Sequence, residues 1–295
     1  MSVKPFKNYD EQIGLLEARG LEVPDHNLAR EFLKHHNYYR LSAYRFPFQT
    51  ARDQFETASS FDDLCALYRF DHDLRLLVGE ACKCLEISVR ARWAYILGEK
   101  HGELAYEDPA VFRDARLHTQ HLASLDREIT RSHEVFISHY QNTHQMPRPP
   151  IWAACEVMSF GLLSRFYTNI KQSSTRKKIA KTYGFGVSNL ASLLLHASYL
   201  RNLCAHHSRI WNRAFTITVS LPTSQPNEVV AALNHDPQAE RKIYNSLVLL
   251  AHITDTVSAT SDWKGRLKTH LLTLNRPNHS EMGFPAGWEQ LDFWN

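Results

Sequence analysis

Three polar residues that lie close together in the sequence could combine a fixed charge with proton transfer: Arg201, Asn202 and His206. The apolar spacing of residues 187–207 predicts a helix, and residues four apart on a helix, such as Asn202 and His206, lie on one side. Arg201 is expected in the middle of the adjacent apolar face, where an arginine is rarely left without a partner. One helix would therefore present a cation, an amide and an imidazole together, and an imidazole can move protons near neutral pH.

Two glutamates are expected to face the core near this set. Helical spacing places Glu156 on a core-facing stripe of a helix over 151–171, and Glu86 on a core-facing stripe of a longer helix over 61–97. Arg201 is a natural partner for either carboxylate, and such an ion pair would orient its guanidinium. Two further residues are candidates for a supporting role, namely His207 and Arg209.

The same set also has a purely structural explanation. Several other arginines of this histidine-rich chain precede a histidine at a similar spacing, so spacing alone does not identify a catalytic site. Arg201 is distinguished by its neighbour Asn202, by its expected place on an apolar face and by the adjacent polar stripe. On these residues alone, an interior hydrogen-bond network stays open beside catalysis.

Two segments carry residues suited to bind nucleic acid. A cluster of positive charges before the 187–207 helix suits phosphate contacts, although a solvated helix face has the same pattern. Residues 37–48 combine tyrosines with arginines that could stack on and clamp unpaired bases, although aromatic residues at helical spacing more often form core. The candidate RNA-binding residues are Arg176, Lys177, Lys178 and Lys181 in the first segment and Tyr39 and Arg40 in the second.

The composition is that of an ordinary globular protein. The 295 residues are 43% hydrophobic and 22% charged, which excludes a disordered, collagen-like or coiled-coil protein. The formal charge is only +3, so nucleic acid would have to bind through a local patch. Five cysteines without paired spacing, no secretory leader and no apolar run of membrane length lead us to expect a soluble cytoplasmic protein that does not contact membranes.

Helical periodicity over most of the chain predicts an all-α fold. We expect three parts: an N-terminal helical segment over 1–58, a helical domain over 59–275 and a tail over 276–295. Residues 215–221 alternate well enough to be the only plausible strand, and one strand cannot form a sheet. The remaining expected helices cover 8–19, 25–36, 116–143, 174–183, 236–252 and 258–275.

The sequence has no familiar motif for phosphate or metal chemistry. It lacks a Gly-rich phosphate loop, a His-Glu-x-x-His helix and a Gly-x-Ser-x-Gly elbow, which disfavours nucleotide hydrolases, zincins and serine hydrolases. Cys82 and Cys84 are separated by one residue and have no second pair, and Cys204 lies near His206 and His207 without further ligands. We therefore expect neither a metal nor a cofactor.

Three ordered blocks of the sequence carry a family resemblance. Residues 37–44 read Asn-Tyr-Tyr-Arg-Leu-Ser-x-Tyr, residues 150–164 begin Pro-Ile-Trp, and residues 201–213 begin Arg-Asn-x-Cys-Ala-His-His. With the Met-Gly-Phe-Pro of the tail at 282–285, these blocks resemble the Abi-like (abortive infection) proteins of bacteria over nearly the whole chain. That family is similar to the wider HEPN group of helical ribonucleases, whose motif is Arg-x(4–6)-His with a polar residue after the arginine.

The resemblance implies an all-α, HEPN-type helical bundle with an N-terminal helical extension, and an endoribonuclease that needs no metal. His206 would act as general base or acid while a 2′-hydroxyl attacks phosphorus, Arg201 would stabilise charge on the phosphate, and Asn202 would hold His206 or the phosphate. HEPN sites commonly combine two motif copies, so a homodimer is implied. Ser208 stands where some HEPN toxins carry a tyrosine that is adenylylated, so that mode of control is not supported.

The implied role is phage defence by abortive infection, or action as a toxin, with RNA as the substrate and a structured noncoding RNA as an inhibitor. One rival is a non-catalytic protein that binds a structured RNA through the same site. A second rival is structural: Arg201 would be buried against Glu156 or Glu86 and would bind no ligand.

Overall fold

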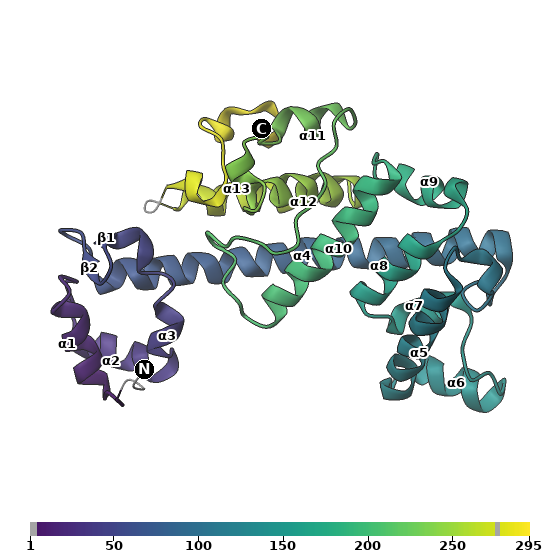
Figure 1. The fold of residues 1–295 in the computed structure, drawn as a ribbon, viewed down its shortest axis with the longest axis horizontal. Coiled ribbons are helices and arrows are strands. Elements are labelled where there is room, and N and C mark those ends of the chain that lie inside the picture. The colour runs from purple at the N-terminus through teal and green to yellow at the C-terminus, as the bar shows by residue number, and fades with distance from the viewer. Residues whose placement is uncertain (1–4, 275–277) are drawn as a thin grey trace.

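A single 41-residue helix, α4 (Phe61–His101), runs along much of the molecule, and most other helices pack against it (Figure 1). The computed structural model describes residues 5–274 and 278–295. At 1.5 Å per residue, α4 is about 60 Å long. A capping box formed by Ser60 fixes its N-terminus, and it ends at Gly102, whose φ of 86° favours glycine.

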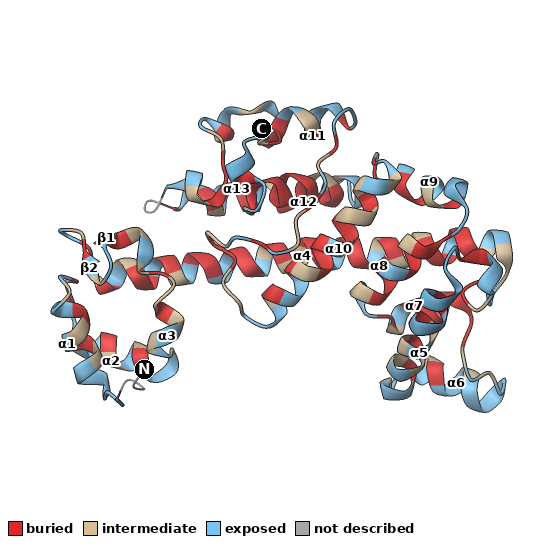
Figure 2. Ribbon diagram, in the orientation of Figure 1, coloured by how far each residue is buried: buried red, intermediate tan, exposed pale blue. Residues whose placement is uncertain are grey.

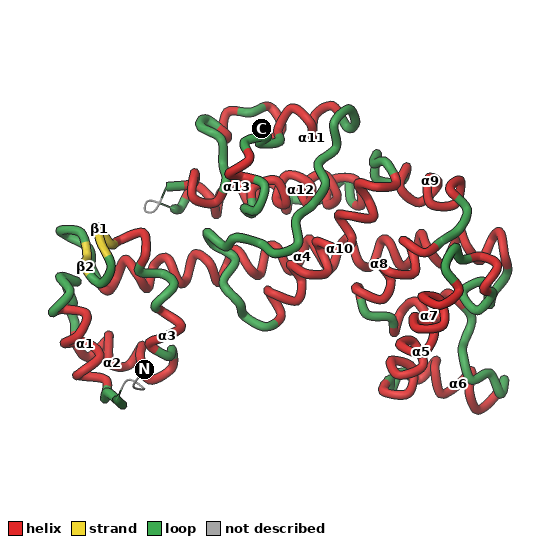
Figure 3. Tube along the Cα trace, in the orientation of Figure 1, coloured by secondary structure: helices red, strands yellow, loops and turns green. Residues whose placement is uncertain are grey.

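The fold is all-α, as the periodicity predicts, and the described residues contain one small sheet. This sheet pairs β1 (Gln49–Ala51) with β2 (Gln54–Phe55) in an antiparallel hairpin (Figure 3). The expected strand at 215–221 is wrong, because no neighbouring segment offers it a backbone ladder. Side chains of α10 bind this backbone instead, as in the 2.7 Å contact between His196 Nδ1 and the Ile217 carbonyl.

Helices α5 to α9 lie around the C-terminal part of α4 (Figure 1). The helix expected over 151–171 is broken at Ser159, whose side chain caps α8 and whose backbone N–H donates to Glu128 at 2.8 Å. The helix expected over 116–143 is likewise interrupted between Arg131 and Val135. The bounds are α5 Ala115–Arg131, α6 Val135–Thr143, α7 Ile151–Val157, α8 Phe160–Asn169 and α9 Ser173–Lys181.

A second layer covers another side of α4. Helix α12 is buried over most of its length between α4 and the elements outside it (Figure 2). Helix α13 is fastened to α4 by the Trp263 indole, which donates to the Leu77 carbonyl at 2.9 Å. The bounds are α10 Val187–Ala205, α11 Asn227–Ala232, α12 Tyr244–Val257 and α13 Trp263–Leu272.

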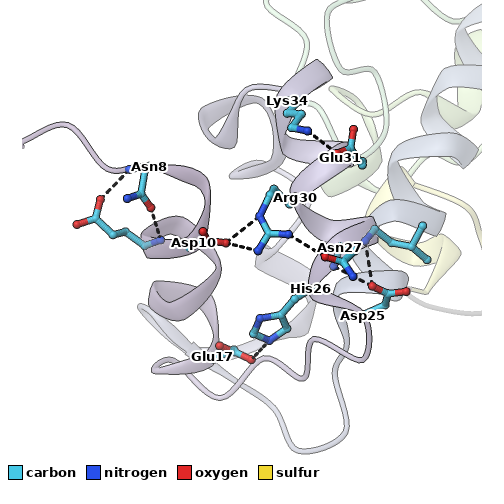
Figure 4. Close-up of polar contacts among 11 residues, drawn as sticks. Asn8, Asp10, Glu17, Asp25, His26, Asn27, Arg30, Glu31 and Lys34 are labelled. Carbon is cyan, nitrogen blue, oxygen red and sulfur yellow. Dashed lines mark hydrogen bonds and ion pairs between the residues drawn. The ribbon is translucent and has the colours of Figure 1, made fainter.

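The N-terminal segment folds at the opposite end of α4 from α5 to α9 (Figure 1). Asp25 caps α2 as predicted, and two side-chain contacts hold α1 against α2 (Figure 4). Arg30 pairs with Asp10 at 2.6 Å, and His26 shares a hydrogen bond with Glu17 at 2.7 Å. The bounds are α1 Tyr9–Glu17, α2 His26–His35 and α3 Tyr38–Leu41.

Buried apolar side chains from Ile13 to Trp294 belong to one continuous cluster. The three-part division of the chain stays a prediction, and its boundary at 275–276 lies outside the described residues. Among the helices that the structure describes, none combines the length and apolar character needed to cross a membrane.

Candidate functional site

The C-terminal end of α10 sets the geometry of the predicted site. The helix ends at Ala205, and His206 is the C-cap residue. His207 follows with a φ of 55°, its N–H donates to the Cys204 carbonyl, and the Ser208 N–H donates to the Leu203 carbonyl at 2.8 Å. These contacts form a Schellman motif, in which the left-handed position usually belongs to glycine. The fold therefore holds a histidine in an unfavourable backbone conformation directly after His206.

Arg201, Asn202 and His206 are all exposed at this helix end. The Arg201 side chain is 47% exposed, so its expected burial on an apolar face is wrong. The reason is that α8 begins at Phe160. Its first turn packs closely on α10, since a Cβ added at Gly161 would lie 3.2 Å from Ser198 Oγ. The helix does not extend over the next turn of α10, where Arg201 lies. Arg201 Nη1 donates to Asn202 Oδ1 at 3.4 Å. The structure thus brings the three side chains to an open surface.

Glu86, a carboxylate of α4, lies next to the Arg201 guanidinium on its buried side. Glu86 is buried, as predicted, and its Oε2 lies 3.9 Å from Arg201 Nε. Arg90 donates to the other Glu86 oxygen at 2.6 Å and to the Met158 carbonyl at 2.7 Å. Because Glu86 has two cationic partners and only one of them is the exposed arginine, it can orient Arg201 without enclosing it.

Glu156 lies beside this pair but not in the core. Its side chain is 50% exposed, with an oxygen 3.7 Å from Arg90 Nη1. The expected core-facing position is wrong because α7 ends at Val157, so Glu156 occupies the last turn of a short helix and not the middle of a long one. Burial raises the pKa of Glu86, and the nearby Glu156 charge raises it further, while Arg90 and Arg201 oppose both effects.

A buried aspartate that the sequence analysis missed fixes the loop after α10. Asp71 of α4 accepts hydrogen bonds from the backbone N–H groups of Ile210 at 3.1 Å and Trp211 at 2.7 Å. It also accepts from the Tyr44 hydroxyl and pairs with Arg75. The available signal was an aspartate among Leu67, Leu74 and Val78 on the apolar stripe of a long helix. Asp71 therefore determines where the chain goes immediately after His206.

Arg209, a candidate for a supporting role, does not lie on the same helix face as Asn202 and His206, although helical spacing beyond residue 205 would place it there. The helix ends before Arg209, and this side chain turns back to donate to the Trp211 carbonyl at 2.7 Å. Burial lowers the pKa of Arg209, and the nearby Asp71 carboxylate opposes that effect. Arg209 therefore belongs to the support of the loop and not to its exposed surface.

The N-terminal segment also contacts this loop. Arg40 Nη2 donates to the His207 carbonyl at 2.7 Å, and Arg40 Nε donates to the Tyr68 hydroxyl at 3.0 Å. Arg40 is thus placed beside the candidate site. Tyr44 is buried, as expected of a core aromatic, whereas Tyr39 is exposed. The core interpretation of this aromatic segment therefore holds for only part of it.

The basic cluster of α9 lies far from His206. Arg176, Lys177 and Lys181 line a hollow of about 620 Å³ at the start of α10, together with Arg113, and no acidic residue lines it. Lys178 instead pairs with Glu99 at 2.6 Å. Because α10 has 19 residues, its two ends are about 27 Å apart. The cluster and Arg201 therefore cannot contact the same phosphate group.

Among residues 5–274 and 278–295, no group of three or more His, Cys, Asp or Glu side chains is arranged to hold a metal ion. Cys82 is buried beside Cys204, and burial raises the pKa of both thiols. The exposed side chains at the end of α10 combine a cation, an amide and an imidazole, groups that are capable of charge stabilisation and acid–base chemistry.

A family model described as "Abi-like protein" matches residues 31–212. The matched range begins in α2, includes the whole of α4 and ends within the loop that follows α10. It contains Arg40, Glu86, Arg201 and His206. No curated protein and no solved structure matches the chain.

Proposed function

Because this chain belongs to the Abi-like protein family, we propose that it is a metal-independent endoribonuclease of the HEPN type, acting in abortive-infection defence or as a toxin. The observation that carries the proposal is the position of Arg201, Asn202 and His206 on one exposed helix end, with Arg201 oriented by buried Glu86. Structural arginines and histidines are normally covered or paired. In the described part of the chain, the His206 imidazole makes no hydrogen bond or ion pair.

The proposed reaction is transesterification within RNA. A histidine takes the proton of a 2′-hydroxyl, the 2′-oxygen forms a bond to phosphorus, and the bond from phosphorus to the 5′-oxygen breaks. The 5′-oxygen leaves with a proton from a general acid. Arg201 stabilises the negative charge that grows on the phosphate oxygens, and Asn202 positions the phosphate or His206. The products carry 2′,3′-cyclic phosphate and 5′-hydroxyl ends.

A second copy of the chain would supply the second acid–base group. One motif copy provides a single His206, whereas the reaction uses a base and an acid. The exposed Leu195 lies about 20° from both Asn202 and His206 around α10 and is 50% exposed. A symmetric contact through this stripe would bury Leu195 and bring two His206 side chains together. We therefore propose a homodimer that joins its two sites.

The basic cluster of α9 would hold the RNA away from the scissile phosphate. Arg113, Arg176, Lys177 and Lys181 surround a hollow at the first turn of α10, whose N-terminus has no side-chain cap. Phosphate contacts of this kind raise affinity in a manner that depends steeply on salt. Arg176, Lys177 and Lys181 stay our candidates for this contact, and Lys178 is the weakest because Glu99 occupies it.

Cleavage of RNA in EDTA tests the proposal. Purified protein is incubated with total RNA beside His206→Ala, and the new ends are mapped. We expect cleavage by the unmodified protein alone, with cyclic-phosphate ends. Tight RNA binding without cleavage would favour one of two alternatives: a non-catalytic RNA-binding protein, or a ribonuclease that a structured noncoding RNA inhibits. The absence of both binding and cleavage would contradict the proposal.

A further inference from the structure

A second surface, separate from the end of α10, has the properties of a binding site. It is a pocket of about 1420 Å³ in the N-terminal segment, formed by residues of α1, α2, α3 and the β1–β2 hairpin. Its size exceeds the roughly 300–1,000 Å³ of most small-molecule sites. The pocket therefore has room for more than one small ligand group.

The pocket is strongly positive. Five lysine and arginine side chains line it against a single carboxylate, Asp53, an excess of four positive charges in a chain whose total is +3. Asp53 lies 3.0 Å from Arg19 and 3.9 Å from Arg45, and Glu31, outside the lining, pairs with Lys34. Among the residues that the structure describes, Lys7 and Arg52 have no carboxylate partner. The five are Lys7, Arg19, Lys34, Arg45 and Arg52. This imbalance favours an anionic ligand.

Aromatic side chains share the same walls. Tyr39 is 68% and Phe46 is 65% exposed, and both line the same pocket, where exposed aromatic groups that lie together mark an interaction site. Tyr38 lies deeper: its hydroxyl accepts from Arg19 at 3.2 Å and from Arg45 at 3.1 Å, and the Arg45 guanidinium lies over its ring at 5.6 Å. The pocket thus offers flat faces for stacking directly beside positive charges.

Two buried donors in the pocket wall have no acceptor. Within residues 5–274 and 278–295, neither Arg45 Nε nor Gln49 Nε2 has a hydrogen-bond partner, and both residues line the pocket. Buried donors of this kind are normally satisfied, because an unpaired donor costs about 1–3 kcal/mol. Unpaired donors beside stacking faces and cations point to a ligand with oxygen or nitrogen acceptors.

From these observations we propose that the pocket binds a short unpaired segment of RNA and anchors the substrate next to the cleavage site. Nucleotides combine the stacking bases, the acceptors and the phosphates that the pocket requires. The position of the pocket agrees with this role. Tyr39 lines the pocket, and the next residue, Arg40, donates to the carbonyl of His207 beside the candidate catalytic residues. The inference rests on the proposed ribonuclease function and adds to it a preference for single-stranded RNA at one side of the scissile phosphate.

The binding test uses fluorescein-labelled decauridylate, a ten-base-pair RNA duplex and AMP as a competitor, all with His206→Ala protein so that no probe is cleaved. Combining Tyr39→Ala with Phe46→Ala is expected to weaken binding of the single strand about tenfold or more and to leave duplex binding unchanged. Tyr95→Ala removes a similarly exposed tyrosine on α4 and is the matched control. Unchanged binding of the single strand would overturn the proposal. If AMP competed at the same concentration as the decamer, the pocket would be a mononucleotide site and the proposal would be overturned.

A second variant and a second readout keep the two proposals separate. Arg52→Glu reverses an exposed charge of the pocket and carries the test if the double variant does not fold. In protein with His206 intact, both pocket variants are expected to raise KM for single-stranded RNA and to leave kcat unchanged. Lost affinity in a protein that never cleaves would support the pocket and refute the ribonuclease. Cleavage with an unchanged KM would support the ribonuclease and refute the pocket.

Discussion

Two carboxylates of α4, Asp71 and Glu86, have the same local arrangement and opposite surroundings. Each is paired with an arginine four residues later, Arg75 or Arg90, and each faces α10 or the loop that follows it. Asp71 is completely enclosed, and backbone N–H groups and a tyrosine hydroxyl occupy its oxygens. Glu86 is buried too, but its partner Arg201 is half exposed.

The difference shows how one helical motif serves two purposes. Where other groups close over the pair, as at Asp71, the carboxylate fixes the path of the chain. Where no helix covers the pair, as beside Arg201 next to the start of α8, the carboxylate leaves a cation oriented and accessible. Full enclosure therefore indicates a stabilising role, whereas an oriented and half-exposed cation is what the proposed reaction requires.

The largest expected effect on stability is at the enclosed pair. Asp71→Ala would leave Arg75 and two backbone N–H groups buried without their acceptor, so we expect a loss of about 3–5 kcal/mol in the free energy of unfolding. Urea denaturation measures this loss, and Asp71→Asn, which keeps an acceptor oxygen, is the control expected to lose less. A loss below 1 kcal/mol for Asp71→Ala would show that Asp71 is not a structural anchor.

The buried histidine of α10, His196, predicts acid sensitivity. His196 is buried between the Ile217 carbonyl and Ser246, and burial lowers its pKa to about 4. Because the folded-state pKa lies below the unfolded value of about 6.5, the unfolded chain takes up the proton first as pH falls. Stability that is complete above pH 6.5 should therefore fall by about 3 kcal/mol toward pH 4. His196→Gln should flatten this part of a curve of unfolding free energy against pH, and an equally steep curve would contradict the assignment.

For the pair of Glu86 and Arg201, the expected effect is on the rate of the proposed reaction. Glu86→Gln removes the charge that orients Arg201 while keeping the shape of the side chain. Misplacing a catalytic group by about 1 Å can lower the rate about 100-fold, and we expect a loss of this size in kcat. Because burial already disfavours the charged form of Glu86, its replacement should change unfolding by only about 1 kcal/mol. A large loss of stability with normal kcat would reverse the comparison between Glu86 and Asp71.

The smallest expected effect separates the proposed function from its structural rival. Arg201→Ala should change the free energy of unfolding by less than about 1 kcal/mol, because the Arg201 side chain is half exposed and Glu86 keeps Arg90 as a partner. Thermal and urea unfolding measure this directly, with Arg201→Lys as the control that keeps the charge. A loss of several kcal/mol would mean that Arg201 is a structural residue.

Sequence periodicity was enough to predict the all-α class, the long central helix and the helix that carries Arg201. It was not enough to predict where helices break, because the break at Ser159 depends on a capping contact with Glu128 from a distant helix. That break in turn exposes Glu156 at the end of α7 and, because α8 begins only at Phe160, leaves Arg201 exposed. A helical projection identifies the direction of a side chain but not whether a neighbouring helix reaches it.

The candidate site was predictable in its chemistry and not in its support. Arg201, Asn202 and His206 stay the predicted catalytic set, and the predicted contact between Arg201 and Glu86 is present at 3.9 Å. Asp71 was missed because an aspartate on an apolar stripe has no sequence signature that distinguishes an anchor from an exception. The contact of Arg40 with the His207 carbonyl joins residues 167 positions apart, so no local pattern could indicate it.

The most direct test of the central claim measures the cleavage rate and the RNA affinity of His206→Ala in the same preparation. We predict that the first-order rate of cleavage in EDTA falls at least about 100-fold, while the Kd for RNA and the free energy of unfolding stay unchanged. His235→Ala removes another exposed histidine and should cleave at the normal rate. An unchanged rate for His206→Ala would contradict the claim that the exposed end of α10 is a catalytic site.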